Sequence, residues 1–343
     1  ALALAAPLLV RAQSGMRRTL GVGPNERFRT LHAAMHAAAS GDVVEVQPGE
    51  YHGDAAVVAL PRLTIRGLGA GAVFHADGRD AEGKGILVVR GDVVVENLEF
   101  RGARVPAGNG AGIRFERGRL AVRRCRFFDN EMGILTANDA DMELDVAGCE
   151  FGAAPRHEGA LHHLLYVGAI GEFSIRGSRF SGGWRGHLLK SRALRSRVLY
   201  NHLDDRPAGE ASYEIEFPNG GDNVVVGNLI AQSAKTQNPD LVSMGAEARD
   251  GMRGSLVLTD NTLVNAAGPQ ARFVHVWAER LAGETPVRIA DNRFVGPGEL
   301  DLPPAGTAAA IGGSTRRAFA PLIVAATHPP IGRCSPADTR APG

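Results

Sequence analysis

The side chains best able to do chemistry lie in short apolar segments that recur along the chain. Tyr166, Lys190 and Glu216 each occupy the middle of such a segment, and Arg192 follows Lys190 by two positions. A β-elimination at a uronate sugar needs groups of these kinds. One neutralises the sugar carboxylate, one removes the C5 proton, and one protonates the leaving oxygen.

Each of these roles has a candidate residue. Arg192 offers a fork of N–H donors to a carboxylate, Lys190 is the candidate base, and Tyr166 or His187 is the candidate acid. As a base, Lys190 must lose its proton, which Arg192 and partial burial favour and Glu216 opposes. Five further residues are candidates for contacts with a sugar chain: His163, Glu214, Asn219, His275 and Trp277.

Two other functions fit the same residues. Glu214 and Glu216 are expected on one side of a strand, roughly 6.6–7 Å apart at the backbone, which is in the range of an inverting glycosidase pair. A non-catalytic carbohydrate-binding or envelope-assembly protein would instead use Tyr166, Trp277 and arginines to hold a sugar chain. Lys190 beside Glu216 can also be a plain surface ion pair.

These residues need a scaffold that brings distant segments side by side. The segments that carry them alternate apolar and polar residues, as strands do. They are 112–115, 133–136, 164–167, 188–191, 213–217, 241–244 and 273–276. Stacked in register, they predict an outward row of Tyr166, Lys190, Glu216, Ser243 and His275. Flanking rows are Gly168, Arg192, Pro218, Gly245 and Trp277 on one side, and Leu164, Leu188, Glu214, Leu241 and Phe273 on the other.

A second repeat follows each of these segments at intervals of roughly 23 to 33 residues, about one turn of a solenoid. It pairs a small polar residue with an apolar residue two positions later, as in Asn228/Ile230. The polar position is filled by Cys125, Cys149, Ser178, Asn201, Asn228, Asn261 and Asn292. Asparagines stacked in this way can form a hydrogen-bonded ladder, and the two cysteines are then packing residues and not a disulfide.

The N-terminal stretch supplies a family resemblance. Residues 28–38 have helical spacing of apolar residues, 43–46 read as a strand, and a turn is expected at 48–51. Residues 28–51 resemble the first coil of the pectate-lyase-like superfamily, which implies an all-β, right-handed parallel β-helix with a short N-terminal capping helix. The stretches 186–193 and 211–221 are similar to a motif of uncharacterised bacterial β-helix proteins. The calcium-site aspartates of classical pectate lyases are not recognisable.

Composition limits the partners and the location. The formal net charge of +1 argues against nucleic acid as a partner. The apolar segment 1–12 is similar to the end of a signal peptide, so a periplasmic or secreted protein is expected. No later segment has the roughly 18 apolar residues of a membrane span, so stable membrane insertion is not expected. No cysteine or histidine cluster has metal-ligand spacing, so no cofactor is expected and calcium is not indicated.

The expected organisation is one β-helix domain at 19–302, followed by a C-terminal cover or loose tail at 303–343. The expected protein is a monomer that acts on, or binds, an acidic polysaccharide.

Overall fold

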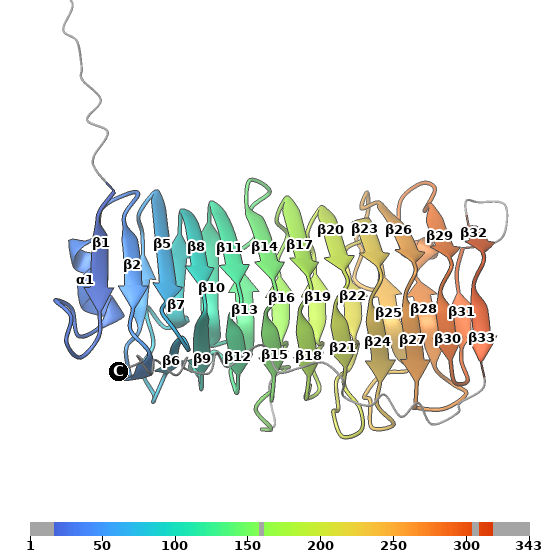
Figure 1. Cartoon of the computed structure of the whole chain (residues 1–343). Helices are drawn as coiled ribbons and strands as arrows, with labels where there is room; N and C mark the ends of the chain where they lie inside the picture. Colours follow the sequence, from blue (N-terminus) through green and yellow to red (C-terminus); the bar gives the residue numbers. More distant parts are fainter. Residues whose placement is uncertain (1–16, 158–160, 304–308, 318–343) are drawn as a thin grey trace, which may run out of the picture.

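The chain winds into a right-handed parallel β-helix, whose successive coils stack along one axis (Figure 1). The computed structural model describes residues 17–157, 161–303 and 309–317. Within these residues the coils form three long parallel sheets, of 12, 10 and 11 strands. Each interior strand pairs with the equivalent strand one coil earlier and one coil later, so residues far apart in sequence become lateral neighbours. The fold that the family resemblance implied is confirmed.

The strands of the three sheets follow the chain in rotation. The ten-stranded sheet, which carries the candidate site, contains β4 (Ala56–Val58), β7 (Gly85–Arg90), β10 (Ala111–Arg117), β13 (Met132–Thr136), β16 (Leu165–Val167), β19 (Leu189–Ser191), β22 (Ile215–Phe217), β25 (Asp240–Met244), β28 (Arg272–Val276) and β31 (Glu299–Asp301). The predicted chemistry-bearing segments are therefore consecutive members of one sheet, with small shifts at their ends.

The other two sheets complete each coil. The eleven-stranded sheet contains β3 (Gly49–His52), β6 (Ala72–His75), β9 (Leu98–Arg101), β12 (Arg126–Phe128), β15 (Glu150–Gly152), β18 (Arg179–Ser181), β21 (His202–Asp204), β24 (Leu229–Gln232), β27 (Thr262–Asn265), β30 (Arg293–Val295) and β33 (Thr315–Arg317). The twelve-stranded sheet contains β1 (Thr19–Val22), β2 (Val43–Val46), β5 (Arg62–Gly67), β8 (Asp92–Glu96), β11 (Arg119–Arg123), β14 (Glu143–Ala147), β17 (Glu172–Arg176), β20 (Arg195–Leu199), β23 (Gly221–Val226), β26 (Gly254–Thr259), β29 (Val287–Ala290) and β32 (Ala309–Gly312).

The core is a set of side-chain columns that run along the helix axis. Strand alternation sends every second residue inward, and equivalent inward residues of neighbouring coils stack. One column consists of aromatic rings with neighbouring centroids 4.6 to 5.8 Å apart: Tyr51, Phe74, Phe100, Phe127, Phe151 and Phe180. This stacking fixes the register of the coils, because a slip of one residue would turn the rings outward.

The predicted asparagine ladder is confirmed. The side-chain amide of Asn228 donates to Asn261 Oδ1 at 2.9 Å, and its own Oδ1 accepts from Asn201 Nδ2 at 3.1 Å. Cys125 and Cys149 continue this position in earlier coils, and both are free, buried thiols. Their role in packing is thus confirmed.

The ends of the solenoid differ from the sequence-based expectation in two places. The residues expected to form a turn at 48–51 lie largely in β3, which pairs with β6. Strands β32 and β33 continue two of the sheets past residue 302, so the coils extend beyond the expected boundary. The segment 1–12 lies outside the described residues, as does most of 303–343.

Helical structure is sparse in the described residues. The short helix α1 (Leu31–Ala37) lies at the N-terminal end (Figure 1), where Leu31 and Ala34 join the core. Thr30 caps it by accepting a hydrogen bond from the Ala33 N–H. A single 3-10 turn, η1 (Ala278–Arg280), follows β28. Within the described ranges, no helix has the length and apolar character needed to cross a membrane.

Candidate functional site

The predicted outward row exists in the ten-stranded sheet. The pairing aligns Tyr166 with Lys190 and Lys190 with Glu216, and continues from Glu216 through Ser243 to His275. We call these five residues the polar row. Four of its members are nonetheless buried: Lys190, Glu216, Ser243 and His275. Glu247, after β25, contacts Lys190, and Trp277, after β28, packs on His275.

Lys190 lies between two carboxylates. Its ammonium donates a hydrogen bond to Glu247 Oε1 at 2.7 Å and lies 3.1 Å from Glu216 Oε2. Its side chain is 8% exposed, and Glu216 is almost completely buried. Its ammonium is therefore held by ion pairs on two sides. These contacts suit a fixed positive charge, whereas a base would need a free amine.

Glu247 is the residue at the centre of this site that the sequence did not reveal. It lies in the connection after β25, and its carboxylate bridges Lys190 Nζ and Arg192 Nη2. Partial burial raises its pKa, but the hydrogen bonds from Lys190 and Arg192 outweigh burial and bring the pKa to about 2. Its side chain remains 46% exposed, so this carboxylate reaches the site from the solvent side.

Arg192 organises the exposed part of the site. Its Nε donates to the Tyr166 hydroxyl at 2.9 Å, and its Nη1 donates to Asn219 Oδ1. Its guanidinium carbon also lies 5.8 Å from the centre of the Tyr166 ring. The three predicted residues Tyr166, Arg192 and Asn219 are therefore in direct contact.

Two buried histidines support the polar row from behind. The backbone N–H of His187 donates to His163 Nδ1 at 2.9 Å, and the two rings meet edge to face at 4.6 Å. His187 Nδ1 lies 3.0 Å from Glu216 Oε2. Burial, reinforced by nearby positive charge, lowers the pKa of both histidines far below the usual value, so both are neutral at pH 7. Burial also raises the pKa of Glu216 against the opposing effect of Lys190.

An open pocket lies over Tyr166 and Arg192. It has a volume of about 670 Å³ and is lined by Tyr166, Arg192, Asn219, Glu247, Arg249, Arg280 and four smaller or apolar residues. A second pocket of about 450 Å³ shares Arg192 and Asn219 with it and adds Arg195, Asp222 and Arg253. We call the two together the arginine groove. Its five arginines outnumber its two acidic residues, so the lining of the groove carries a net positive charge.

The predicted pairing of the two glutamates is wrong. Glu216 faces Lys190, but Glu214 is fully buried and lies level with Leu188 and Leu241, which belong to the hydrophobic core. Neither carboxylate oxygen of Glu214 has a hydrogen-bond partner among the described residues. Burial raises the pKa of Glu214 well above the usual value, with a further contribution from Asp205. Alternation failed here because residue 214 precedes β22, where the chain turns a corner before it becomes extended.

The remaining predicted residues lie at the C-terminal end of the row. His275 Nδ1 lies 2.7 Å from Asp240 Oδ2, and its Nε2 lies 3.3 Å from Asp301 Oδ2. Trp277 packs on His275 with ring centroids 4.0 Å apart, and the Arg280 guanidinium lies over Trp277 at 4.6 Å. Arg280 also lines the arginine groove. Trp277 therefore supports the groove wall, whereas His275 is held between two carboxylates outside the groove.

Within the described ranges, two side-chain groups have the composition and spacing of metal ligands. They are Glu50, His52 and His75, and Glu131, His157 and His162. Neither group includes a residue of the polar row.

Comparison with known proteins supports the fold. Neither a family model nor a curated protein matches the sequence. Among solved structures, the GH136 lacto-N-biosidase from Eubacterium ramulus aligns with 88% of this chain and 68% of its own, at 11% identity and a TM-score of 0.51. A periplasmic alginate epimerase aligns with 80% of this chain and 77% of its own, at 10% identity and a TM-score of 0.42. At these identities the likeness shows the fold alone. The chain is a right-handed parallel β-helix, with a basic groove beside the polar row.

Proposed function

We propose that this protein acts on an acidic polysaccharide and cleaves it by β-elimination in the arginine groove. The observation that carries the proposal is the carboxylate of Glu247, which bridges Lys190 and Arg192 beside the Tyr166 hydroxyl. A uronate carboxylate has the same charge and the same pair of acceptor oxygens. It can therefore take the place of Glu247 and bind both cations.

The first step of the reaction needs the sugar carboxylate to be neutralised. Arg192 and Lys190 supply two positive charges at a partly buried position, where their stabilisation of a carboxylate is stronger than in water. Neutralising this carboxylate makes the neighbouring C5 proton more acidic. In this role Lys190 is a fixed cation, which agrees with its burial between Glu216 and Glu247.

Proton transfer falls to Tyr166. Its hydroxyl lies at the pocket wall, and its oxygen accepts a hydrogen bond from the Arg192 Nε–H. In its phenolate form Tyr166 takes the C5 proton, the C5–H electron pair forms the C4–C5 double bond, and the C4–O bond breaks with its electron pair left on the oxygen. Tyr166 then returns the proton to the leaving oxygen. His187 is farther from the pocket and positions Glu216, which in turn lies beside Lys190.

The glycosidase alternative loses its support, because Glu214 lies in the core and cannot share a substrate with Glu216. A non-catalytic carbohydrate-binding protein would use the same arginine groove without turnover. The similar fold of the lacto-N-biosidase agrees with a carbohydrate as the ligand. We further propose that the protein is exported to the periplasm or beyond, on the basis of the apolar segment 1–12. We also propose that it acts as a monomer.

Binding and cleavage are tested together on a panel of uronate polymers and matched neutral polymers. We expect binding and new reducing ends with uronate polymers only, and weaker binding as salt rises. Arg192→Ala should lose both activities, whereas Arg119→Ala, an exposed arginine on another sheet, should keep them. Binding without new ends would favour the non-catalytic alternative. Equal binding of neutral and acidic polymers would refute the assigned role of the groove.

A further inference from the structure

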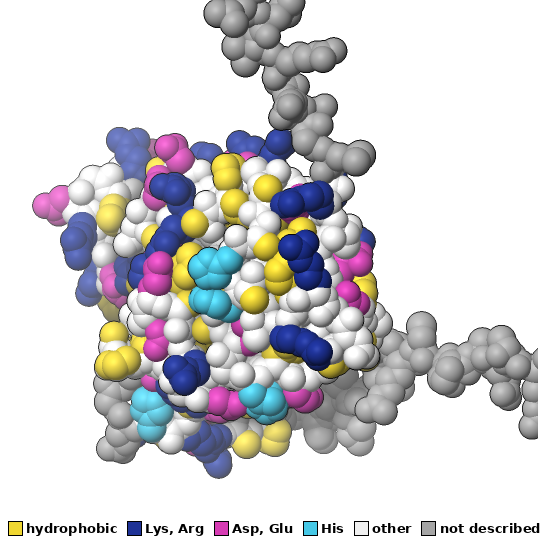
Figure 2. All heavy atoms as spheres, turned by 90° about the vertical axis from the view of Figure 1, so that its left-hand side faces the viewer, with side chains coloured by type: hydrophobic (Ala, Val, Ile, Leu, Met, Phe, Trp, Pro, Cys, Tyr) yellow, Lys and Arg dark blue, Asp and Glu magenta, His cyan; other side chains and the backbone are white. Residues whose placement is uncertain are grey.

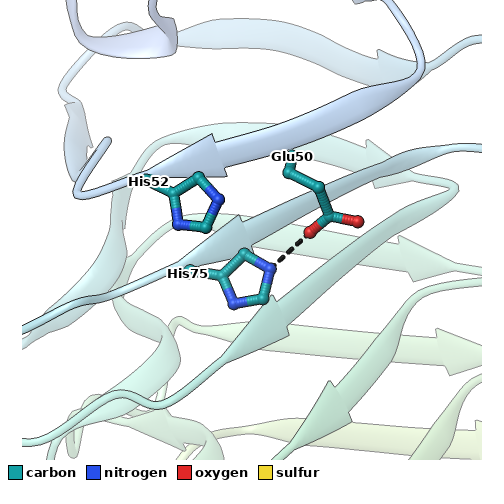
Figure 3. A group of neighbouring side chains, drawn as sticks. All are labelled: Glu50, His52 and His75. Carbon is teal, nitrogen blue, oxygen red and sulfur yellow. Dashed lines mark hydrogen bonds and ion pairs between the residues drawn. The ribbon is translucent and has the colours of Figure 1, made fainter.

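A second cluster of chemically capable side chains lies far from the arginine groove, near the N-terminal end of the solenoid. It consists of Glu50 and His52 on β3 and His75 on β6 (Figure 3). The view of this end in Figure 2 shows histidine side chains beside acidic ones. The groove is built on later coils and on a different sheet, so this cluster plays no part in the proposed cleavage.

The solenoid register brings the three residues together. Glu50 and His52 are two positions apart on β3, so both side chains leave the same face of the strand. The pairing of β3 with β6 sets His75 directly beside His52, and their rings stack at 4.7 Å with an angle of 10°. Glu50 Oε2 contacts His75 Nε2. One ligand atom from each residue lies within 4.8 Å of the other two.

A fourth residue orients one of the histidines. His52 Nδ1 lies 2.6 Å from Asp77 Oδ2. A carboxylate on one ring nitrogen fixes the imidazole tautomer and leaves the electron pair of the other nitrogen for a metal, an arrangement common around bound metal ions. Asp77 closely follows β6, so the same two coils supply all four residues.

We propose that Glu50, His52 and His75 bind one divalent transition-metal ion of the zinc, cobalt or nickel kind. Two imidazoles and one carboxylate are ligands that these ions prefer, whereas calcium and magnesium favour sites made of oxygen atoms alone. The side chains of His52 and Glu50 are 62% and 58% exposed, so an ion can enter from solvent and water can complete its coordination.

The position of the cluster gives the ion a structural effect. β3 is the end strand of the eleven-stranded sheet, with a pairing partner, β6, on one side only. End strands of this kind fray and invite pairing with other chains. An ion held by His52 on β3 and His75 on β6 links the end strand to its neighbour. Bound metal should therefore stabilise the N-terminal coils.

The test is calorimetric titration of the full chain with Zn²⁺, without a polyhistidine tag and after treatment with a chelator. We expect one tight site, together with a rise in the thermal midpoint when Zn²⁺ is added. His52→Ala and His75→Ala should each weaken this binding at least tenfold, and Asp77→Asn should weaken it less. Circular dichroism without metal checks that each variant folds.

The matched control is the double variant His32→Ala/His36→Ala. These histidines lie one turn apart on α1, with their Nε2 atoms 3.2 Å apart, and they can also hold an ion. The control should keep the tight site. The proposal is overturned if the double variant removes the tight site, if His52→Ala and His75→Ala leave the isotherm unchanged, or if the wild type shows no saturable binding.

Discussion

Replacing Glu214 by leucine should stabilise the protein, although glutamate is the native residue. Glu214 is 0% exposed, both of its carboxylate oxygens lack hydrogen-bond partners among the described residues, and the equivalent positions of the adjacent coils are Leu188 and Leu241. Leucine therefore continues an existing apolar column. A buried carboxyl group without a partner is costly to ionise, and it stays protonated in the folded state.

The magnitude follows from proton linkage. Burial raises the pKa of Glu214 in the folded chain, so above the unfolded value of about 4.3 the folded state binds more protons than the unfolded state. Stability from this group therefore falls as pH rises. The loss is about 1.4 kcal/mol for each pH unit over which Glu214 stays protonated when folded. Glu214→Leu removes this loss, so its advantage over the wild type should grow with pH at that rate.

The assay is urea denaturation followed by circular dichroism at pH 5, 6 and 7. The control is Glu279→Leu, since Glu279 is 69% exposed and its substitution should give no advantage that grows with pH. A Glu214→Leu protein that is less stable than the wild type, or whose advantage does not change with pH, would refute the reasoning. If folded Glu214→Gln protein loses all activity, the glycosidase interpretation returns.

Three further predictions concern the ladder, the groove and the polar row. Asn228→Ala should lower the free energy of unfolding by about 2 to 4 kcal/mol, because it leaves buried partners such as the Asn201 N–H unsatisfied. Urea denaturation measures this loss, and an unchanged midpoint would contradict the prediction. Glu247→Gln should bind acidic oligosaccharides about tenfold more tightly, a gain of about 1.4 kcal/mol, because the competing carboxylate of Glu247 is removed. Weaker binding in calorimetry would contradict the idea that the sugar carboxylate takes the place of Glu247. Lys190→Met should lose activity, and it also leaves the buried Glu216 carboxylate without its cation, which should destabilise the fold. Adding Glu216→Gln to the same chain should restore the stability of the fold but not the activity. A double variant as active as the wild type would exclude Lys190 as a required cation.

Much of the fold can be predicted because a solenoid repeats its signals. The asparagine positions and the apolar alternation each recur once per coil, so errors in one coil are corrected by its neighbours. The same repetition is enough to predict the register of Tyr166, Lys190 and Glu216 from the sequence. The turn expected at 48–51 is wrong for a local reason. The proline and glycine at the start of β3 favour a turn, and only the pairing with β6 makes this segment extended.

The site is harder to predict than the scaffold. Glu247 lies in a connection between strands, and no periodicity indicates that it folds back over Lys190. Strand alternation predicts an outward Glu214 only if β22 already includes residue 214. β22 begins at Ile215, and residue 214 lies in the bend before it. The histidine cluster does carry a signal in the sequence. His52 and His75 are about one coil apart, so a spacing typical of the solenoid brings together ligands that no short metal motif would reveal.

The most direct test of the proposed reaction is the ultraviolet absorbance of the unsaturated ends that β-elimination creates. With a uronate polymer as substrate, the wild type should produce this absorbance in step with new reducing ends. Tyr166→Phe should abolish it while the polymer still binds, and Tyr200→Phe, at an exposed tyrosine on another face, should leave it unchanged. Reducing ends without absorbance, or a Tyr166→Phe protein as fast as the wild type, would contradict the mechanism.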